Sequence, residues 1–441
     1  MRQHLIRNVF NQYQHQENRL THALVQVLAR NPRLTREFLR RFVDGFAPAP
    51  GEEILISCQR FPDQESERLP EDEALQQENA GRGIPDFWMY RKSADNGPGW
   101  AVICECKVQA RLEAEQLRSH CNTAQGLRLG RLYVLTITPT TEPEVVRLLP
   151  TAVRASSRTW SEVYEFLDDY RHEVLVDDFL DYMHVIEGEL TSEGKEFEPL
   201  TKFTGITFDP MNPYSDVVAM STLRALMKEL RLRLDEPNVL AVDTSIRRKP
   251  LVSPWDVIGF KLAQGDSVFT RHPHLTVGIG KNEASIQLTL PNAAGPRYWR
   301  RIRTCNSQEL ASVLRAVADR LRPMRRSLPL GRWEPTIILY LQQLHFFARR
   351  YEIMDGNLEF DVSASLGDST QSGVKLVSAW LEAIRSVLKQ TPRANFEAAL
   401  QVRFPYAKNS RCSDAGFVDA LVGSAEALHP FLALLVEGSQ P

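Results

Sequence analysis

Apolar residues recur at helical spacing near the start of the chain. Between Asn8 and Arg30 they fall three or four positions apart, which predicts an amphipathic helix. The stripe comprises Phe10, Tyr13, Leu20, Ala23, Leu24, Val27 and Leu28. Asn31 and Pro32 then end this helix and begin a second one, whose apolar stripe is Leu34, Phe38 and Phe42.

Short segments rich in β-branched and aromatic residues follow, and each predicts a strand. They span 53–58, 84–90, 100–107 and 131–138. The highly charged segment 60–83 separates the first two and predicts a solvated loop. A helical pattern at 112–127, with Ala114, Leu117, Cys121 and Ala124 on one face, precedes the fourth strand. The predicted order is therefore α-β-β-β-α-β, with an additional helix near the start.

The first half of the chain continues with helices and one more strand. We expect a helix at 142–149, a short strand ending in Trp160, a helix capped by Ser161 with Glu162 in its first turn, and a helix at 173–187. The polar, aperiodic segment 190–203 then predicts a domain boundary. We expect domains at 1–195 and 196–441.

The second half mixes the two periodicities and predicts an α+β domain. Helices are expected at 215–234, 307–321, 373–389 and 414–436, a hairpin from 267–280 and 284–291, and a strand at 358–366. The apolar run 336–354 fits a strand or a helix. The stretches ASIQLTLPNAAGPRYWRR (284–301) and AALQVRFPYAKNSRCSD (398–414) each place proline and a loop after an alternating strand, so either an internal repeat or coincidence explains them.

Composition narrows the class of protein. The chain has 441 residues, of which 43% are hydrophobic and 24% charged, as in an ordinary folded protein. The net charge of −2 means that binding to nucleic acid or to an anionic membrane would depend on local patches. Six scattered cysteines indicate reduced thiols and a cytoplasmic location. We find no signal peptide and expect no membrane-spanning run of ~18 apolar residues.

Three charged residues interrupt the best strand-forming sequence. Asp86 lies within IPDFWMY, and Glu105 and Lys107 lie within WAVICECK. Residues two apart on a strand share a face, so Glu105 and Lys107 are expected side by side, with Asp86 near one end if the strands pair. Desolvating two unpaired carboxylates costs several kcal/mol, and a divalent cation offsets that cost. This grouping predicts a metal-dependent phosphodiesterase site.

These residues, as I-P-D followed by E-C-K, resemble the PD-(D/E)XK nuclease superfamily over about residues 1–190. The resemblance implies a restriction-endonuclease-like fold with an αβββαβ core, in which helices flank a mixed sheet. It implies that Asp86 and Glu105 bind Mg²⁺ or Mn²⁺ and that Lys107 is catalytic. It also suggests Glu17, on the first helix, as a further metal ligand, and Gln116 as a catalytic glutamine.

Other interpretations of the same residues stay open. Asp86 could be a strand-edge residue, with Glu105 and Lys107 an exposed pair, or the fold could have lost its activity. Cys104 and Cys106 have zinc-like spacing, but no second cysteine pair accompanies them, so small buried thiols are the simpler interpretation.

Basic and aromatic residues alternate in GPRYWRRIR (295–303) of the second half. The candidate nucleic-acid contacts are Arg297, Trp299, Arg300, Arg301 and Arg303. Arginines suit phosphate contacts and an exposed tryptophan suits base stacking. A second basic segment lies at 320–333. Solvated helix surfaces are the alternative explanation.

The resemblance therefore implies a Mg²⁺-dependent endodeoxyribonuclease and suggests a bacterial defence or restriction-type effector. The alternatives are a ribonuclease, or a non-catalytic nucleic-acid-binding or scaffold protein that retains the fold. Expected partners are DNA or RNA, with a second copy or a defence-system protein. The second domain is expected to recognise nucleic acid, to self-associate or to sense a signal.

Overall fold

The computed structural model divides the chain into two compact units, Met1–Lys202 and Phe203–Pro441. The described residues are 15–59, 84–91, 99–126, 130–208, 210, 213–236, 241–246, 248, 251, 253–262, 268–326, 334–347, 350–363, 371–390 and 395–436. The start of the first predicted helix and the charged loop at 60–83 lie outside them.

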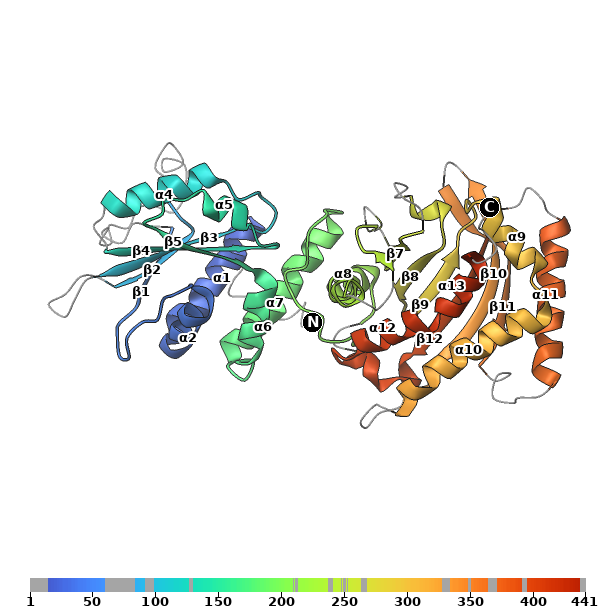
Figure 1. Cartoon of the computed structure of the whole chain (residues 1–441). Coiled ribbons are helices and arrows are strands. Elements are labelled where there is room, and N and C mark those ends of the chain that lie inside the picture. The colour runs from blue at the N-terminus through green and yellow to red at the C-terminus, as the bar shows by residue number, and fades with distance from the viewer. Residues whose placement is uncertain are drawn as a thin grey trace. The chain divides into compact units, whose positions relative to one another are not determined.

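The first unit is a mixed sheet between helices (Figure 1). Its elements are α1 (Gln16–Arg30), α2 (Pro32–Phe42), β1 (Leu55–Cys58), β2 (Phe87–Arg91), β3 (Trp100–Cys106), α4 (Ala114–Gly126), β4 (Arg131–Thr138), α5 (Pro143–Arg147), β5 (Arg154–Thr159), α6 (Trp160–Asp168) and α7 (Val174–Ser192). The strands lie in the order β1-β2-β3-β4-β5. Pairing is antiparallel from β1 to β3 and parallel from β3 to β5. The element order therefore agrees with the sequence-based expectation.

Strand β3 presents its side chains alternately to two separate cores, as the period of a strand requires. Val102, Cys104 and Cys106 pack with helices α1, α2, α6 and α7. Ala101 and Ile103 pack on the other side with α4. The two cysteines are buried thiols, as predicted. Glu105 follows Ile103 on the α4 side, so its carboxylate faces a helix and not water.

The helix starts illustrate one prediction that holds and one that is wrong. The Asn31 side chain accepts a hydrogen bond from Leu34 N (3.1 Å) and caps α2, as expected. Ser161 does not cap α6. Thr159 caps it instead, in a capping box: the Thr159 hydroxyl accepts a hydrogen bond from Glu162 N, and the Glu162 carboxylate accepts one from the Thr159 backbone N–H at 2.6 Å. Helix α6 therefore begins directly where strand β5 ends.

The first unit ends a few residues later than the predicted boundary at 195/196. The buried carboxylate of Glu187 on α7 explains the difference. It accepts hydrogen bonds from the backbone N–H groups of Leu200 (2.6 Å) and Thr201 (3.0 Å), and from the Thr201 hydroxyl (2.8 Å). These bonds tie 200–201 back to the first unit, and Leu200 packs in its core.

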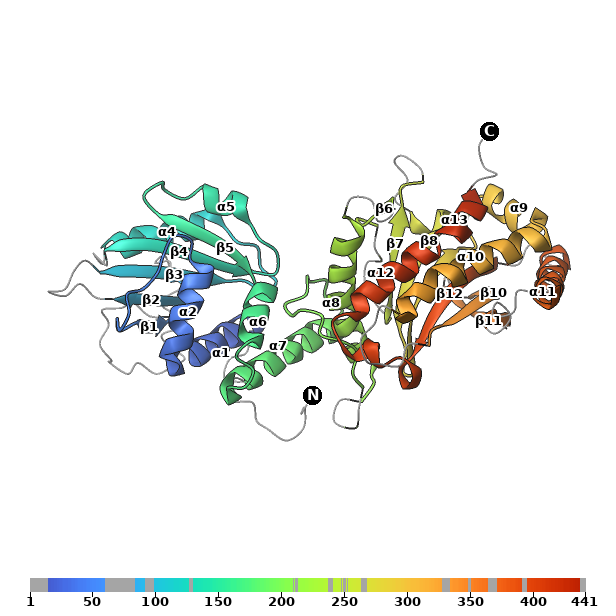
Figure 2. The same ribbon diagram turned by 60° about the horizontal axis from the view of Figure 1, so that its bottom comes forward.

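The second unit is an antiparallel sheet packed against helices (Figure 2). Its helices and strands are α8 (Asp216–Leu234), β6 (Val242–Asp243), β7 (Trp255–Phe260), β8 (His274–Ile279), β9 (Glu283–Leu290), α9 (Pro296–Thr304), α10 (Ser307–Arg326), β10 (Thr336–Phe347), β11 (Arg350–Asp361), α11 (Gln371–Gln390), β12 (Asn395–Pro405), α12 (Phe417–Ala427) and α13 (His429–Val436), with short 3₁₀ turns at Phe269–Arg271, Tyr406–Lys408 and Ser410–Ser413. The described strands lie in the order β11-β10-β12-β9-β8-β7-β6. The coarse α+β expectation agrees with this architecture.

The structure of the second unit decides two predictions. One segment was ambiguous between strand and helix, and another was predicted as a single helix. The run 336–354 forms strand β10 and the start of β11, and Ile337, Leu339 and Leu341 alternate into the core. The single helix expected at 414–436 is two helices, α12 and α13. Pro430 lies in the first turn of α13, where its missing N–H cannot extend α12.

The stretch Phe417–Val436 qualifies the expectation that no segment resembles a membrane span. With 20 residues and a mean hydropathy of 1.4, it is long and apolar enough to cross a membrane by length and composition alone. However, 61% of it is buried inside the structure, and Leu421, Phe431 and Leu435 pack in the core of the second unit. These residues therefore serve as core helices within this unit.

The two sequences of the possible internal repeat form neighbouring strands at the middle of this sheet. Gln287 of β9 lies directly opposite Gln401 of β12, and Gln401 Nε2 donates to Gln287 Oε1 (2.8 Å). In the two stretches, Ala284 corresponds to Ala398 and Leu290 corresponds to Phe404. Ala284 lies opposite Phe404, and Ala398 lies opposite Leu290. The two stretches are thus related by an approximate two-fold axis through the glutamine pair. The chain path differs, however, because helix α11 precedes β12 whereas a hairpin precedes β9.

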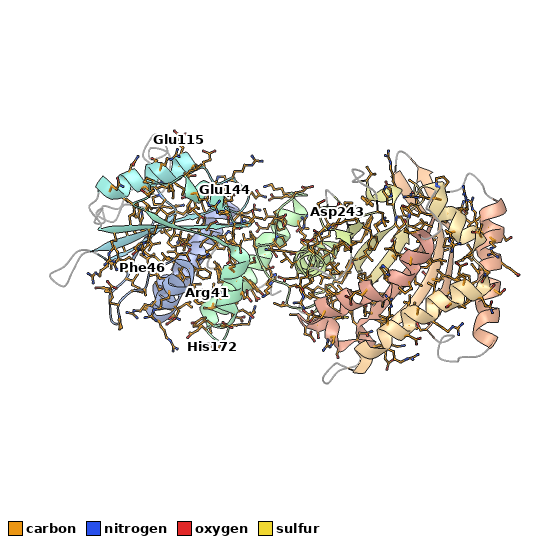
Figure 3. The ribbon with its side chains drawn as sticks, viewed as in Figure 1. Arg41, Phe46, Glu115, Glu144, His172 and Asp243 are labelled. Carbon is orange, nitrogen blue, oxygen red and sulfur yellow. The ribbon has the colours of Figure 1, made fainter. Side chains whose placement is uncertain are left out.

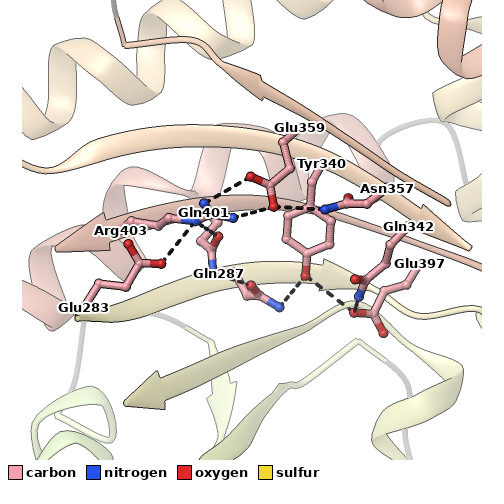
Figure 4. A network of polar contacts seen from close by, with 9 residues as sticks. All are labelled: Glu283, Gln287, Tyr340, Gln342, Asn357, Glu359, Glu397, Gln401 and Arg403. Carbon is pink, nitrogen blue, oxygen red and sulfur yellow. Dashed lines mark hydrogen bonds and ion pairs between the residues drawn. The ribbon is translucent and has the colours of Figure 1, made fainter. Parts of the chain in front are cut away.

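A network of polar side chains surrounds this glutamine pair (Figure 4). Gln287 Nε2 donates to the Tyr340 hydroxyl (2.6 Å), and Gln342 Nε2 donates to Glu397 (2.9 Å). Arg403 binds the Glu359 carboxylate with both terminal nitrogens, at 2.8 and 3.1 Å. Polar side chains on four adjacent strands therefore supply one another with hydrogen-bond partners.

Candidate active site

Glu105 and Lys107 meet at the C-terminal end of strand β3. Lys107 Nζ lies 2.7 Å from Glu105 Oε1, and the two side chains are 10% and 1% exposed. The backbone at Lys107 is fixed on both sides. Its N–H donates to Ile137 O of β4 (2.9 Å), and its carbonyl accepts from the buried Trp160 indole (2.9 Å). The exposed-pair interpretation of these two residues is therefore wrong.

Glu17 reaches the same point from helix α1. Its Oε1 lies 3.3 Å from Lys107 Nζ, and its Oε2 accepts a hydrogen bond from Val108 N at 3.2 Å. The Lys107 ammonium thus lies between two carboxylates from different elements. The structure therefore brings the helix glutamate of the sequence analysis to the strand residues, although some 90 positions separate them in the chain.

Asp86 lies immediately before strand β2, at the same end of the sheet. Its Oδ2 accepts a 2.6 Å hydrogen bond from the backbone N–H of Cys106, between the other two site residues. Antiparallel pairing of Phe87 with Cys104 produces this approach. Burial and the nearby Glu105 charge raise the pKa of Asp86 well above its ordinary value, against the lowering effect of the Cys106 hydrogen bond. The positive charge near Asp86 is therefore too small to offset its burial and the repulsion from Glu105.

Helix α4 supplies two polar side chains to Glu105. Gln116 Nε2 donates to Glu105 Oε1 at 2.7 Å, so this glutamine lies at the site as expected. His120, which the sequence analysis did not consider, has its Nε2 3.2 Å from Glu105 Oε2, and only 1% of its side chain is exposed. The sequence contains a signal for His120. It lies four positions after Gln116, and residues four apart share a face of a helix.

Neighbouring charges shift the pKa values of Glu105 and Lys107 in opposite directions. Burial tends to raise the pKa of Glu105, but the nearby His120 and Lys107 outweigh it and lower that pKa. Burial tends to lower the pKa of Lys107, but Glu105 and Glu17 reverse this and raise it. Lys107 is therefore an ammonium ion at neutral pH, and Glu105 is a carboxylate.

The chemistry of the donor set fits a hard divalent cation. Asp86, Glu105 and Glu17 offer only oxygen atoms, which suit Mg²⁺ or Mn²⁺. Within the described part of the chain, no three histidine, cysteine, aspartate or glutamate residues are gathered closely enough to surround a metal ion. Mg²⁺ is commonly held by one or two carboxylates with water and phosphate completing its shell, so Asp86 and Glu105 would suffice.

The basic segment of the second unit forms helix α9. The prediction that Trp299 of this helix stacks on bases is wrong, because its side chain is buried. Trp299 is 8% exposed, packs in the core and donates its indole N–H to Pro291 O at 3.3 Å, so it presents no face for base stacking. Arg301 is paired with Glu309 and donates to Leu434 O at 3.1 Å. Arg297, Arg300 and Arg303 are exposed. Residues 327–333 of the second basic segment lie outside the described residues.

Comparisons with protein-family models, with curated proteins and with solved structures give no match for this chain.

Proposed function

We propose that the chain is a metal-dependent nuclease that hydrolyses phosphodiester bonds of DNA, and that its first unit is a PD-(D/E)XK nuclease domain with a restriction-endonuclease-like core. One observation carries this proposal. Asp86, Glu105, Lys107 and Glu17 come from three separate segments and converge at one end of strand β3, inside an apolar sheet. A packing role alone gives no reason to gather three carboxylates there.

Asp86 and Glu105 would hold the metal ion, with Glu17 as an additional carboxylate. When bound, Mg²⁺ or Mn²⁺ polarises a phosphoryl oxygen and lowers the pKa of its coordinated water. Lys107 would donate hydrogen bonds to the phosphate oxygens, where negative charge grows in the transition state. Its raised pKa favours this role over that of a general base at neutral pH. Trp160 and Gln116 would keep Lys107 and Glu105 in place.

The choice of DNA, the endonucleolytic mode and a bacterial defence or restriction role in the cytoplasm rest on the family resemblance alone. The second unit would recognise nucleic acid, self-associate or sense a signal. Its exposed Arg297, Arg300 and Arg303 support a contact with phosphates.

Purified protein incubated with Mg²⁺ or Mn²⁺ tests the proposal directly. Supercoiled plasmid, linear duplex, single-stranded DNA and RNA are offered in parallel, with EDTA as the control. Nicking or linearisation of the closed plasmid supports an endodeoxyribonuclease, whereas cleavage of RNA alone indicates a ribonuclease. Binding of nucleic acid without cleavage at any metal concentration indicates a non-catalytic protein.

A further inference from the structure

We infer that His120 is a positioning residue for Glu105, and that a hydrogen bond to Oε2 fixes this carboxylate in the orientation in which it would hold the metal ion. The inference rests on the proposed function, because it concerns the same site. It starts from the 3.2 Å separation between His120 Nε2 and Glu105 Oε2.

The two oxygen atoms of Glu105 have different surroundings. Oε1 lies 2.7 Å from Lys107 Nζ and accepts a 2.7 Å hydrogen bond from Gln116 Nε2. Among the described residues, neither Oε2 nor the two ring nitrogens of His120 has a hydrogen bond of acceptable geometry, although all are buried. Leaving such a buried group without a hydrogen bond is unfavourable. His120 Nε2 and Glu105 Oε2 are near enough to satisfy each other after a small rotation.

This asymmetry gives His120 a distinct task. Lys107 and Gln116 both contact Oε1, whereas His120 Nε2 lies 3.2 Å from Oε2. A hydrogen bond from His120 would therefore restrain the second oxygen of the carboxylate. In metalloproteins, carboxylate ligands are commonly held by such outer hydrogen bonds, which fix the ligand before the ion arrives.

His120 itself is poorly suited to bind the ion. Mg²⁺ prefers oxygen ligands to imidazole nitrogen, and His120 Nε2 faces Glu105 Oε2 at 3.2 Å. Leu117 and Cys121 anchor the same face of α4 in the core, which holds the imidazole in position. The geometry therefore supports an indirect role.

The test replaces His120 by Phe, which keeps the ring volume without a donor, and by Gln, whose amide nitrogen can occupy a similar position. Binding of Mn²⁺ to the full chain is measured by isothermal titration calorimetry. The metal dependence of plasmid cleavage is measured in parallel. We expect His120→Phe to raise the dissociation constant of the metal roughly 10- to 100-fold. His120→Gln should restore most of the affinity, and excess metal should recover most of kcat in His120→Phe.

Cys121→Ala is the matched control, because Cys121 is buried on the same helix without contacting Glu105. It should lower the melting temperature and leave the metal constant unchanged. If wild type cleaves DNA and His120→Phe binds metal as wild type does, the inference is overturned while the proposed function stands. If wild type binds metal without cleaving and His120→Phe weakens that binding, the nuclease proposal fails and the inference holds. If wild type binds no metal, both fail.

Discussion

The Lys107 ammonium and the Glu105 carboxylate form an ion pair at 2.7 Å in the interior of the first unit. Removing one partner of such a pair leaves an uncompensated buried charge, which typically costs 3–5 kcal/mol. Substitutions at this site therefore need isosteric variants, so that loss of cleavage is separated from loss of folding.

Asp86→Asn, Glu105→Gln and Lys107→Met should each reduce cleavage by at least about 10²–10³-fold, since each removes a charge that the proposed transition state needs. Alanine variants should be equally inactive. The measurement is plasmid cleavage at saturating Mg²⁺, with circular dichroism to confirm folding. Glu115→Gln is the matched control, because Glu115 neighbours Gln116 but points outward from α4 (Figure 3). Full activity in any of the three variants would remove that residue from the site.

EDTA should stop cleavage reversibly, because the proposed chemistry needs an ion that Asp86 and Glu105 hold. Mg²⁺ and Mn²⁺ should restore it, since oxygen ligands favour these ions. Ca²⁺ should permit DNA binding with little cleavage, because its larger and looser shell positions water poorly. Undiminished cleavage in EDTA would exclude the mechanism.

Arg297, Arg300 and Arg303 should contribute to the salt dependence of duplex binding if α9 contacts phosphates. The slope of log affinity against log salt is about −0.9 per phosphate contact, so the triple alanine variant should flatten it by up to ~3 units. Sequence preference should not change, because phosphate contacts carry no base information. Arg41→Ala, at an exposed position of α2, is the control. An unchanged slope would mean that α9 does not contact DNA.

Trp299→Ala should destabilise the second unit by about 3–5 kcal/mol, because the indole fills its core. Urea unfolding of the full chain measures this change. Trp299→Phe should retain more of the stability. Weaker single-strand binding by a fully stable Trp299→Ala protein would contradict the buried position and restore a stacking role.

Stability of the second unit should decline as the pH falls from about 6.5 to 4. Burial lowers the pKa of His274 to about 4, despite hydrogen bonds with the backbone of His272 and Phe269. The unfolded chain therefore binds the proton more tightly, and stability present above pH ~6.5 is lost on acidification, by up to about 3 kcal/mol.

His274→Asn should flatten this pH dependence, because it removes the titrating imidazole. Asn can still donate toward His272 O, which lies 3.0 Å from His274 Nδ1, so the local contact is retained. His172→Asn, at an exposed position of the first unit, should leave it unchanged. An NMR titration that gives His274 a pKa near 6.5 in the folded protein would refute the prediction.

Local patterns allowed much of the fold to be predicted. Asn31 and Pro32 marked a helix start because capping depends on neighbouring residues, and the alternation in β3 separated Glu105 from Cys104 and Cys106. Ser161 was chosen wrongly because Thr159 and Ser161 both carry hydroxyls near the helix start. Only the observed backbone shows which one has the extended conformation of a cap.

The polar partners of the site were harder to predict. Gln116 was found through a family pattern, whereas His120 resembles any helix histidine until the packing of α4 on β3 is known. The stacking role predicted for Trp299 was wrong for the opposite reason. Its arginine neighbours suggested a surface, yet this nine-residue helix presents Tyr298, Trp299 and Ile302 to the core. Arg297, Arg300 and Arg303 are exposed.

The position of β12 in the second unit has a consequence for synthesis of the chain. This strand joins β10 to β9, so without it the described strands separate into a β10–β11 hairpin and a β6–β9 meander. It is also the last described strand to leave the ribosome. The first unit precedes it in the chain and can fold while translation continues, whereas the sheet of the second unit closes only after β12 has been synthesised, through contacts of large sequence separation that form slowly.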